Sequence, residues 1–302
     1  MTLGLGAEVK TNEGANMRDS MDVSTAREAL WLWVSVIAAV FAVAGSVTAL
    51  SVKSIYASLT PAFLVEALAQ DVVNLTIVSP FWLVLAWLAS RGSWRAYLLW
   101  IGVLTFTVYN YVIYTFAIPF GPLFLLWVAV LGLCMYALIG GITSIECNAV
   151  QLLFTNRRAV TVVGFFLIIT ALLFGVLWLS EDVPALISGR TPQTLIDRAL
   201  PTNPVHVLDY AFFLPAAIMI GVFLVKRKPF GYVLAPAFMV FLILTGMPIL
   251  VTPVIHAVRG EEAGWSIVVP MGTLTVVSIA LLTWLMSKHS AFNLKNPMKL
   301  RR

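Results

Sequence analysis

Charged residues are scarce in this sequence. Asp, Glu, Lys and Arg together make up 11% of its 302 residues, whereas an average soluble domain contains about 25%. Hydrophobic residues make up 60%, and the mean hydropathy is +0.94. A soluble chain of this length needs more polar side chains to cover its surface. The composition therefore excludes a cytosolic enzyme, a secreted disulfide scaffold and a disordered chain, and it indicates that lipid surrounds most of the protein.

Cysteine is rare, and the common catalytic motifs are absent. Cys134 and Cys147 are the two cysteines, and both are expected toward the reducing cytoplasmic side, where a structural disulfide is not expected. The sequence contains no G-x-x-x-x-G-K-[ST] phosphate loop, no G-x-S-x-G, no H-E-x-x-H and no dinucleotide glycine turn. These absences exclude an ATP-driven pump for this chain alone. No basic patch with interleaved aromatic residues occurs, so no nucleic-acid partner is expected.

Eight apolar runs are long enough to cross a bilayer as helices, which takes about 20 residues each. None of them alternates with the period of a strand, and a helix satisfies all of its backbone hydrogen bonds internally. We therefore predict an all-α, polytopic transmembrane helix bundle. The predicted spans are residues 30–50, 71–90, 96–116, 121–140, 159–180, 205–225, 229–253 and 265–287.

The distribution of Lys and Arg predicts the orientation, because cytoplasmic segments carry more of both. With the N-terminus inside, all but four of the 19 Lys and Arg residues fall on the cytoplasmic side. The four exceptions are Lys53, Arg190, Arg198 and Arg259. We predict a multi-pass protein of the cell inner membrane with both termini in the cytoplasm. No removable signal peptide is expected in the first 29 residues.

Thr-Pro pairs, polar pairs and prolines at matching positions predict an internal repeat of four helices. Thr-Pro occurs after the first and the fifth span, at Thr60 and Thr191, and each is expected to begin a short amphipathic helix on the outer surface. A polar pair followed by a proline then recurs at an offset of 135 residues. The first pair is Asp71-x-x-Asn74 with Pro80, and the second is His206-x-x-Asp209 with Pro215.

The repeat divides the chain into four parts. The predicted parts are a cytoplasmic tail (1–29), a first repeat (30–158), a second repeat (159–288) and a basic cytoplasmic tail (289–302). Because the offset is four spans, the two repeats are expected to be parallel and related by a pseudo-two-fold axis along the membrane normal.

The polar pairs mark the predicted functional site. Residues at i and i+3 share one helix face, and a charge within the membrane faces the bundle interior or a wet cavity rather than lipid. Asn110 and Tyr114 share a face of the third span. We predict an outward-facing pocket between the repeats, in which ligand-binding residues are Asp71, Asn74, Asn110, Tyr114, His206 and Asp209. Structural roles compete with this prediction: Asp71 as a helix cap, the asparagines as interhelical links and Tyr114 as an interfacial aromatic.

Three classes of function fit these residues. The first is a transporter or binder of a small solute or lipid-like ligand, with or without proton coupling. The second is a membrane-embedded enzyme acting on a lipid or lipid-linked substrate, with His206, Asp209 and Asp71 as acid–base catalysts or as ligands of a divalent metal. The third is a non-catalytic sensor or subunit of a membrane complex. The expected partners are the bilayer, a small-molecule or lipid ligand, and a second copy or another subunit; the sequence identifies no cofactor.

Overall fold

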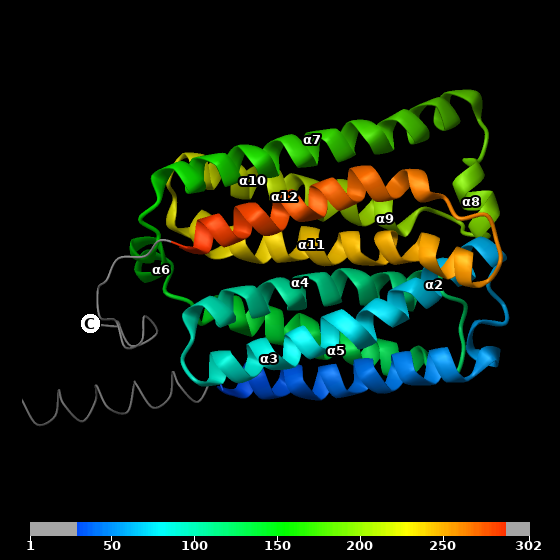
Figure 1. Ribbon diagram of the computed structural model, residues 1–302, viewed down its shortest axis with the longest axis horizontal. Coiled ribbons are helices and arrows are strands. Elements are labelled where there is room, and N and C mark those ends of the chain that lie inside the picture. The colour runs from blue at the N-terminus through cyan, green and yellow to red at the C-terminus, as the bar shows by residue number, and fades with distance from the viewer. Residues whose placement is uncertain (1–28, 288–302) are drawn as a thin grey trace, which may run out of the picture.

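Long helices running side by side form the whole of the described structure. A computed structural model describes residues 29–287, which contain no β-strand (Figure 1). Eight helices in this range are long and apolar enough to cross a membrane, which confirms the predicted multi-pass, all-helical fold. They are Ala29–Ser51, Pro61–Ser90, Trp94–Ala117, Phe124–Thr143, Arg157–Ser188, Pro204–Val225, Pro229–Val258 and Trp265–Ser287. The predicted tails, 1–29 and 289–302, lie outside the described residues apart from Ala29.

Two of the eight spans are interrupted by a π-helix and therefore consist of three elements each. The second span contains α2 (Pro61–Val73), η2 (Asn74–Val78) and α3 (Ser79–Ser90). The sixth contains α9 (Pro204–Leu208), η3 (Asp209–Phe213) and α10 (Leu214–Val225). The other labelled spans are α4 (Trp94–Ala117), α5 (Phe124–Thr143), α7 (Arg157–Ser188), α11 (Pro229–Val258) and, after the short η4 (Trp265–Ile267), α12 (Val268–Ser287).

The π-helices have a local cause. Each ends two residues before a proline, Pro80 or Pro215. Proline has no N–H and its ring clashes with the carbonyl of residue i−4, so the regular α-helical ladder is broken there. A single π turn accommodates this break without ending the helix.

Capping residues fix where several spans begin. The Thr60 side chain accepts a hydrogen bond from the Phe63 N–H (3.3 Å) at the start of α2. Asn203 Oδ1 accepts from the N–H groups of Val205 (3.0 Å) and His206 (3.3 Å) at the start of α9. These caps satisfy N–H groups that have no partner within the helix, and so define the residue at which each helix begins.

α4 and α11 pack together at the centre of the bundle, where Figure 1 shows them side by side. Their closest approach is at Gly102, where an added Cβ would lie 2.6 Å from the Val240 Cβ and 2.7 Å from the Ala237 carbonyl oxygen. α3 and α5 pack on the outer side of α4, while α10 and α12 pack on α11. α7 covers α10 through a similar close contact between Gly164 and Gly221.

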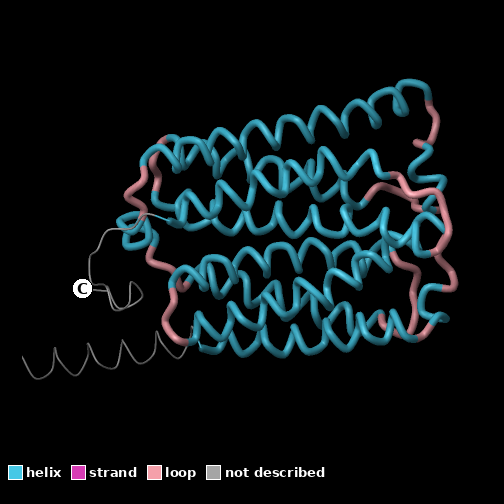
Figure 2. Tube along the Cα trace, viewed as in Figure 1, coloured by secondary structure: helices cyan, strands magenta, loops and turns pink. Residues whose placement is uncertain are grey.

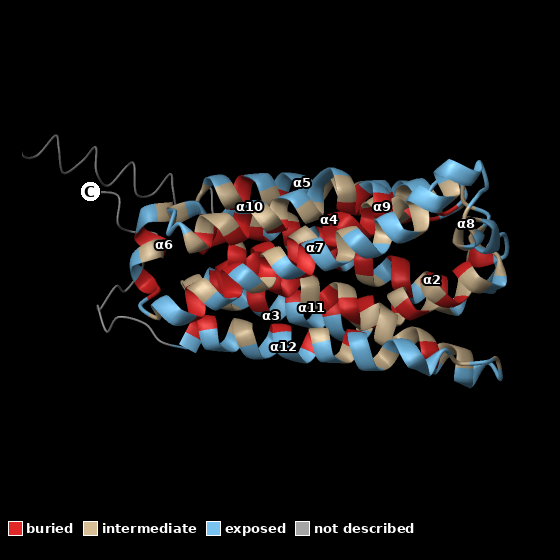
Figure 3. Cartoon of the chain, turned by 90° about the horizontal axis from the view of Figure 1, so that it is seen from above, coloured by how far each residue is buried: buried red, intermediate tan, exposed pale blue. Residues whose placement is uncertain are grey.

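Connecting segments define two ends of the bundle (Figure 2). The "α8 end" comprises residues 52–60, 118–123, 189–203 and 259–264, together with η1 (Lys53–Tyr56) and α8 (Gln193–Arg198). The "α6 end" comprises residues 91–93, 144–156 and 226–228, with α6 (Cys147–Leu153). Buried positions concentrate inside the bundle and exposed positions on its outer surface (Figure 3). Many of the exposed residues are large and apolar, as expected for a protein that contacts lipid.

Two predicted boundaries are wrong by eight residues or more, and the seventh span continues five residues past its predicted end, to Val258. Pro61 does not begin a separate surface helix: it begins the second membrane span, which is therefore ten residues longer than predicted. The fifth span continues to Ser188 instead of ending at residue 180, and its 32 residues are about 48 Å long at 1.5 Å per residue, against a hydrocarbon core of about 30 Å. Its last turns therefore carry charged residues past the apolar core. The second Thr-Pro does precede a separate short helix, α8.

Candidate functional site

A cavity of about 630 Å³ opens at the α8 end of the bundle. Its deepest lining residues include Leu167 on α7, Ala217 on α10 and Phe238 on α11. Each of these lies eight to ten residues, or roughly 12–15 Å, from the α6 end of its helix, which places the cavity floor near the middle of a bilayer. Polar side chains line the opening, whereas aromatic and aliphatic side chains line the floor.

His206 lies at the wall of this cavity and is 4% exposed. Its Nδ1 lies 2.9 Å from Oδ2 of Asp182, which also accepts a hydrogen bond from the Tyr210 hydroxyl at 2.9 Å. The indole of Trp178 lies against the imidazole, with the ring centroids 4.5 Å apart. Asp182 therefore orients the ring from one side and leaves Nε2 without a hydrogen bond to the described residues.

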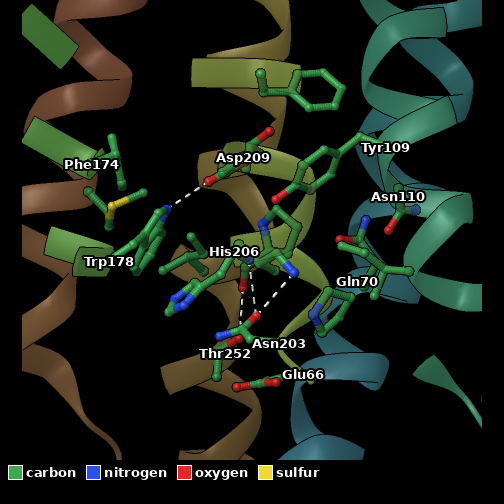
Figure 4. A pocket seen from close by; sticks show the side chains of 18 of the residues that line it. Glu66, Gln70, Tyr109, Asn110, Phe174, Trp178, Asn203, His206, Asp209 and Thr252 are labelled. Atoms are coloured by element: carbon green, nitrogen blue, oxygen red, sulfur yellow. Dashed lines mark hydrogen bonds between the residues drawn. The ribbon is translucent and has the colours of Figure 1, made fainter. Parts of the chain in front are cut away.

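Asp209 lies one turn deeper along the same helix, at the first position of η3. Its carboxylate accepts a hydrogen bond from the Trp178 indole N–H at 2.8 Å (Figure 4). Tyr109 lies beside it in the same view, and the Tyr109 ring packs edge-on against Phe213 and Phe241. A membrane-embedded carboxylate thus faces the cavity among aromatic rings.

An ion pair joins the two halves of the chain at the cavity opening. The Arg198 guanidinium on α8 donates from Nε and Nη2 to both carboxylate oxygens of Glu66 on α2, at 2.5–3.1 Å. This pairing raises the pKa of Arg198 further above its ordinary value. A bidentate geometry orders both side chains more than a single contact would. Thr194 on α8 in turn donates to Glu181 on α7.

Asp71 lies in a separate buried cluster. It is 1% exposed, and its carboxylate accepts hydrogen bonds from the hydroxyls of Tyr56 (2.5 Å), Ser46 (2.8 Å) and Tyr114 (3.0 Å). Burial, followed by the nearby Asp71, raises the pKa of Tyr56, so this hydroxyl stays protonated and donates. Tyr114 lines the cavity, but Asp71 does not.

Asn74 also stays behind the cavity wall. Its Oδ1 accepts from Gln70 Nε2 at 2.9 Å and from Asn110 Nδ2 at 3.4 Å, while its own Nδ2 is buried without a partner. Gln70 and Asn110 both line the cavity. This amide cluster links α2 and η2 to α4, which matches the interhelical role considered as an alternative in the sequence.

The six predicted site residues therefore divide into two sets. Asn110, Tyr114, His206 and Asp209 line one cavity, whereas Asp71 and Asn74 do not. Asp71 is held by hydroxyls from the first helix, η1 and α4 rather than facing His206. Among residues 29–287, no three His, Cys, Asp or Glu side chains are grouped to hold a metal ion, so the geometry does not assemble the predicted set of His206, Asp209 and Asp71.

Three residues at the cavity were not predicted from the sequence. Asp182 lies beyond the predicted end of the fifth span at residue 180, and Trp178 lies within that span without being predicted as a site residue. The spacing of four between them could have indicated a shared helix face. Arg198 had no such signal, because its partner Glu66 is 132 positions away.

Eight apolar helices around a cavity define the chain as a multi-pass integral membrane protein. Comparison with models of known protein families, with curated proteins and with solved structures found no match. The function is therefore argued from the geometry of the cavity alone.

Proposed function

We propose that this protein binds an amphiphilic small molecule in the cavity and transports it across the membrane. The observation that carries the proposal is the division of the cavity, which has a polar opening at one end of the bundle and an apolar floor at mid-depth. Such a cavity matches a ligand with a polar head and an apolar body. Its volume of about 630 Å³ is within the usual range for small-molecule sites.

The position of the cavity between two halves of the chain favours transport over simple storage. We propose that residues 30–158 and 159–288 form two parallel repeats. Several correspondences at an offset of 135 residues support this: η2 matches η3, Pro80 matches Pro215, and Gly102 matches Ala237, which it contacts across the centre. A polar site at the interface of two repeats is one architecture of secondary transporters.

The α4–α11 contact closes the bundle below the cavity floor. We propose that the α8 end faces the outside of the cell inner membrane and that both termini are cytoplasmic, because the Lys and Arg residues favour the α6 end. In this arrangement the cavity is open outward, and transport requires the two halves to separate on the α6 side of Gly102.

Binding is tested with N-phenyl-1-naphthylamine, a neutral amphiphile whose fluorescence rises in apolar surroundings. Ala217→Trp fills the cavity floor, and Gly132→Trp is the matched control, because an added Cβ at Gly132 would meet nothing within 4 Å. We expect saturable binding to the purified wild type and to the control, and its loss in Ala217→Trp. Equal signals from all three proteins, with normal folding, would contradict binding in the cavity.

Transport is tested with the same probe in cells. Expression of the wild type is expected to change the steady accumulation of the probe relative to cells that express Ala217→Trp at the same level. If accumulation is equal but the purified protein binds the probe in its cavity, the protein binds the ligand without transporting it.

One observation favours a second function, that of a membrane-embedded enzyme. Asp182 holds His206 by Nδ1 and leaves Nε2 available, which is the geometry of a general base with a positioning carboxylate. In this alternative His206 takes a proton from water or a hydroxyl at the polar head of a lipid-like substrate. Purified protein incubated with a bilayer lipid extract would then form new lipid species by mass spectrometry. His206→Gln would abolish them while retaining probe binding, and an unchanged lipid profile would remove this alternative.

A further inference from the structure

The charges around the cavity do not balance. Every basic side chain that lines it already faces a carboxylate of its own. The pairs are Arg198 with Glu66, His206 with Asp182, and His256 with Glu261.

Two further carboxylates line the cavity, and within residues 29–287 neither has a cation of its own. Asp209 accepts from the Trp178 indole, and Glu181 accepts from the Thr194 hydroxyl, so both have only uncharged donors. His206, the basic residue closest to Asp209 in sequence, faces Asp182 instead. The cavity therefore presents an excess of negative charge to a ligand.

Asp209 is the deeper of the two unpaired carboxylates and the one set among aromatic rings. It is 9% exposed and lies five residues after the start of α9, or about 7.5 Å along the helix. Tyr109 packs at 4.8 Å from Phe213 and 5.3 Å from Phe241, measured between ring centroids, and the two phenylalanines are stacked at 4.5 Å. Figure 4 shows the Asp209 carboxylate between Tyr109 and Trp178, and Phe213 and Phe241 line the same cavity.

A carboxylate and aromatic faces together select one kind of ligand. Burying a carboxylate without a counter-charge is unfavourable, and a bound cation removes that cost. Ring faces attract organic cations and also accept their apolar substituents. An anionic ligand would meet repulsion at the same position.

We propose that the ligand of this cavity is an amphiphilic organic cation, whose positive centre lies against Asp209 and whose apolar groups fill the floor. This inference rests on the proposed function, because it identifies the substrate class of the same cavity. Glu181 at the opening contributes to the negative potential that attracts the cation.

Two ions of the same shape and opposite charge test the proposal. Tetraphenylphosphonium and tetraphenylborate each carry four phenyl groups, and neither changes charge with pH. Their binding to purified protein is measured by equilibrium dialysis, with the signal of Ala217→Trp subtracted as micelle background. We expect tetraphenylphosphonium to bind at least about tenfold more tightly than tetraphenylborate, in line with the loss that follows removal of one charged partner.

Two matched variants locate the effect. Asp209→Asn is expected to weaken tetraphenylphosphonium binding by about tenfold or more. Asp71→Asn makes the same change at a buried carboxylate that does not line the cavity, and is expected to leave binding unchanged. A second measurement needs no variant: dicyclohexylcarbodiimide labelling of Asp209, mapped by peptide mass spectrometry, should be prevented by tetraphenylphosphonium and not by tetraphenylborate.

The outcomes separate this inference from the function on which it rests. If both ions bind equally, or if Asp209→Asn changes neither, the cation preference is overturned, although the cavity still binds amphiphiles. If neither ion nor N-phenyl-1-naphthylamine distinguishes the wild type from Ala217→Trp, the proposed function fails as well.

Discussion

Replacing Asp71 by Ala should destabilise the bundle more than any conservative change at the same position. The substitution leaves three hydroxyls, those of Ser46, Tyr56 and Tyr114, without their acceptor. Hydrogen bonds between membrane helices contribute about 0.6 kcal/mol on average and at most about 1.7 kcal/mol. The loss of three such bonds is therefore expected to lower the free energy of unfolding by between about 2 and 5 kcal/mol.

Asp71→Asn is the informative comparison. An amide carbonyl in the place of Oδ1 still accepts from Ser46 and Tyr114, and the Tyr56 hydroxyl can rotate to accept from the new NH₂ group. We therefore expect Asp71→Asn to cost at most about 1.7 kcal/mol, one hydrogen bond at its upper limit. Tyr56→Phe should cost about as much in the wild type and almost nothing in the Asp71→Ala background, because the bond it removes is already lost.

Cys134 provides the assay, since it is a buried free cysteine. In a Cys147→Ser background it is the only thiol, and its reaction with a fluorescent maleimide reports unfolding. Free energies of unfolding are measured by SDS titration in mixed micelles. If Asp71→Ala and Asp71→Asn cost the same, or if Tyr56→Phe costs the same in both backgrounds, the hydroxyl cluster does not hold this end of the bundle together.

Three further predictions test other parts of the molecule. Gly221→Leu should destabilise it by about 1–3 kcal/mol, because a Cβ at this position would lie 2.5 Å from the Gly164 carbonyl oxygen, whereas Gly132→Leu should be close to neutral in the same SDS titration. The hydrogen bond from Arg259 lowers the pKa of the partly exposed Glu261 below its ordinary value. A carboxylate with a lowered pKa stabilises the fold above its ordinary pKa, and this contribution is lost as the pH falls through the lowered value. Hydrogen-exchange protection of residues 259–264, after correction for the slower intrinsic exchange in acid, should therefore fall with pH, and Glu261→Gln should remove this pH dependence. A fluorescent protein fused to the C-terminus should fold and fluoresce in cells, and the same protein inserted in residues 259–264 should not, which would be reversed if the termini face outward.

The spans were predictable because a bilayer imposes a length and a composition on each helix. Eight apolar runs became eight helices, and their ends differ from the prediction mainly where polar residues extend an apolar run. At the second span, Pro61 was read as a surface helix, although a Thr–Pro cap can equally begin a membrane helix. At the fifth, Glu181 and Asp182 were read as a loop, since nothing local shows that Thr194 and His206 provide partners for them.

The site was only half predictable for a related reason. Periodicity shows which residues share a face of one helix, and His206 and Asp209, which it placed on one face, line the same cavity. It does not show which neighbouring helix that face meets. Asp71 was expected to meet His206, but hydroxyls on the first helix, η1 and α4 surround it instead. Pairing between helices depends on packing around the whole bundle, and a single sequence carries little trace of it.

The π turn in the second span also determines the direction in which side chains on either side of it point. An α-helix rotates about 100° per residue, so one additional residue in the turn offsets the azimuth of everything before it by that angle. Removing one residue from 74–78 would leave a continuous apolar span of nearly the same length. It would nevertheless swing Glu66 by about 100°, away from Arg198 and out of the cavity opening. A hydropathy profile would barely change on such a deletion, yet the ion pair at the cavity opening would be lost.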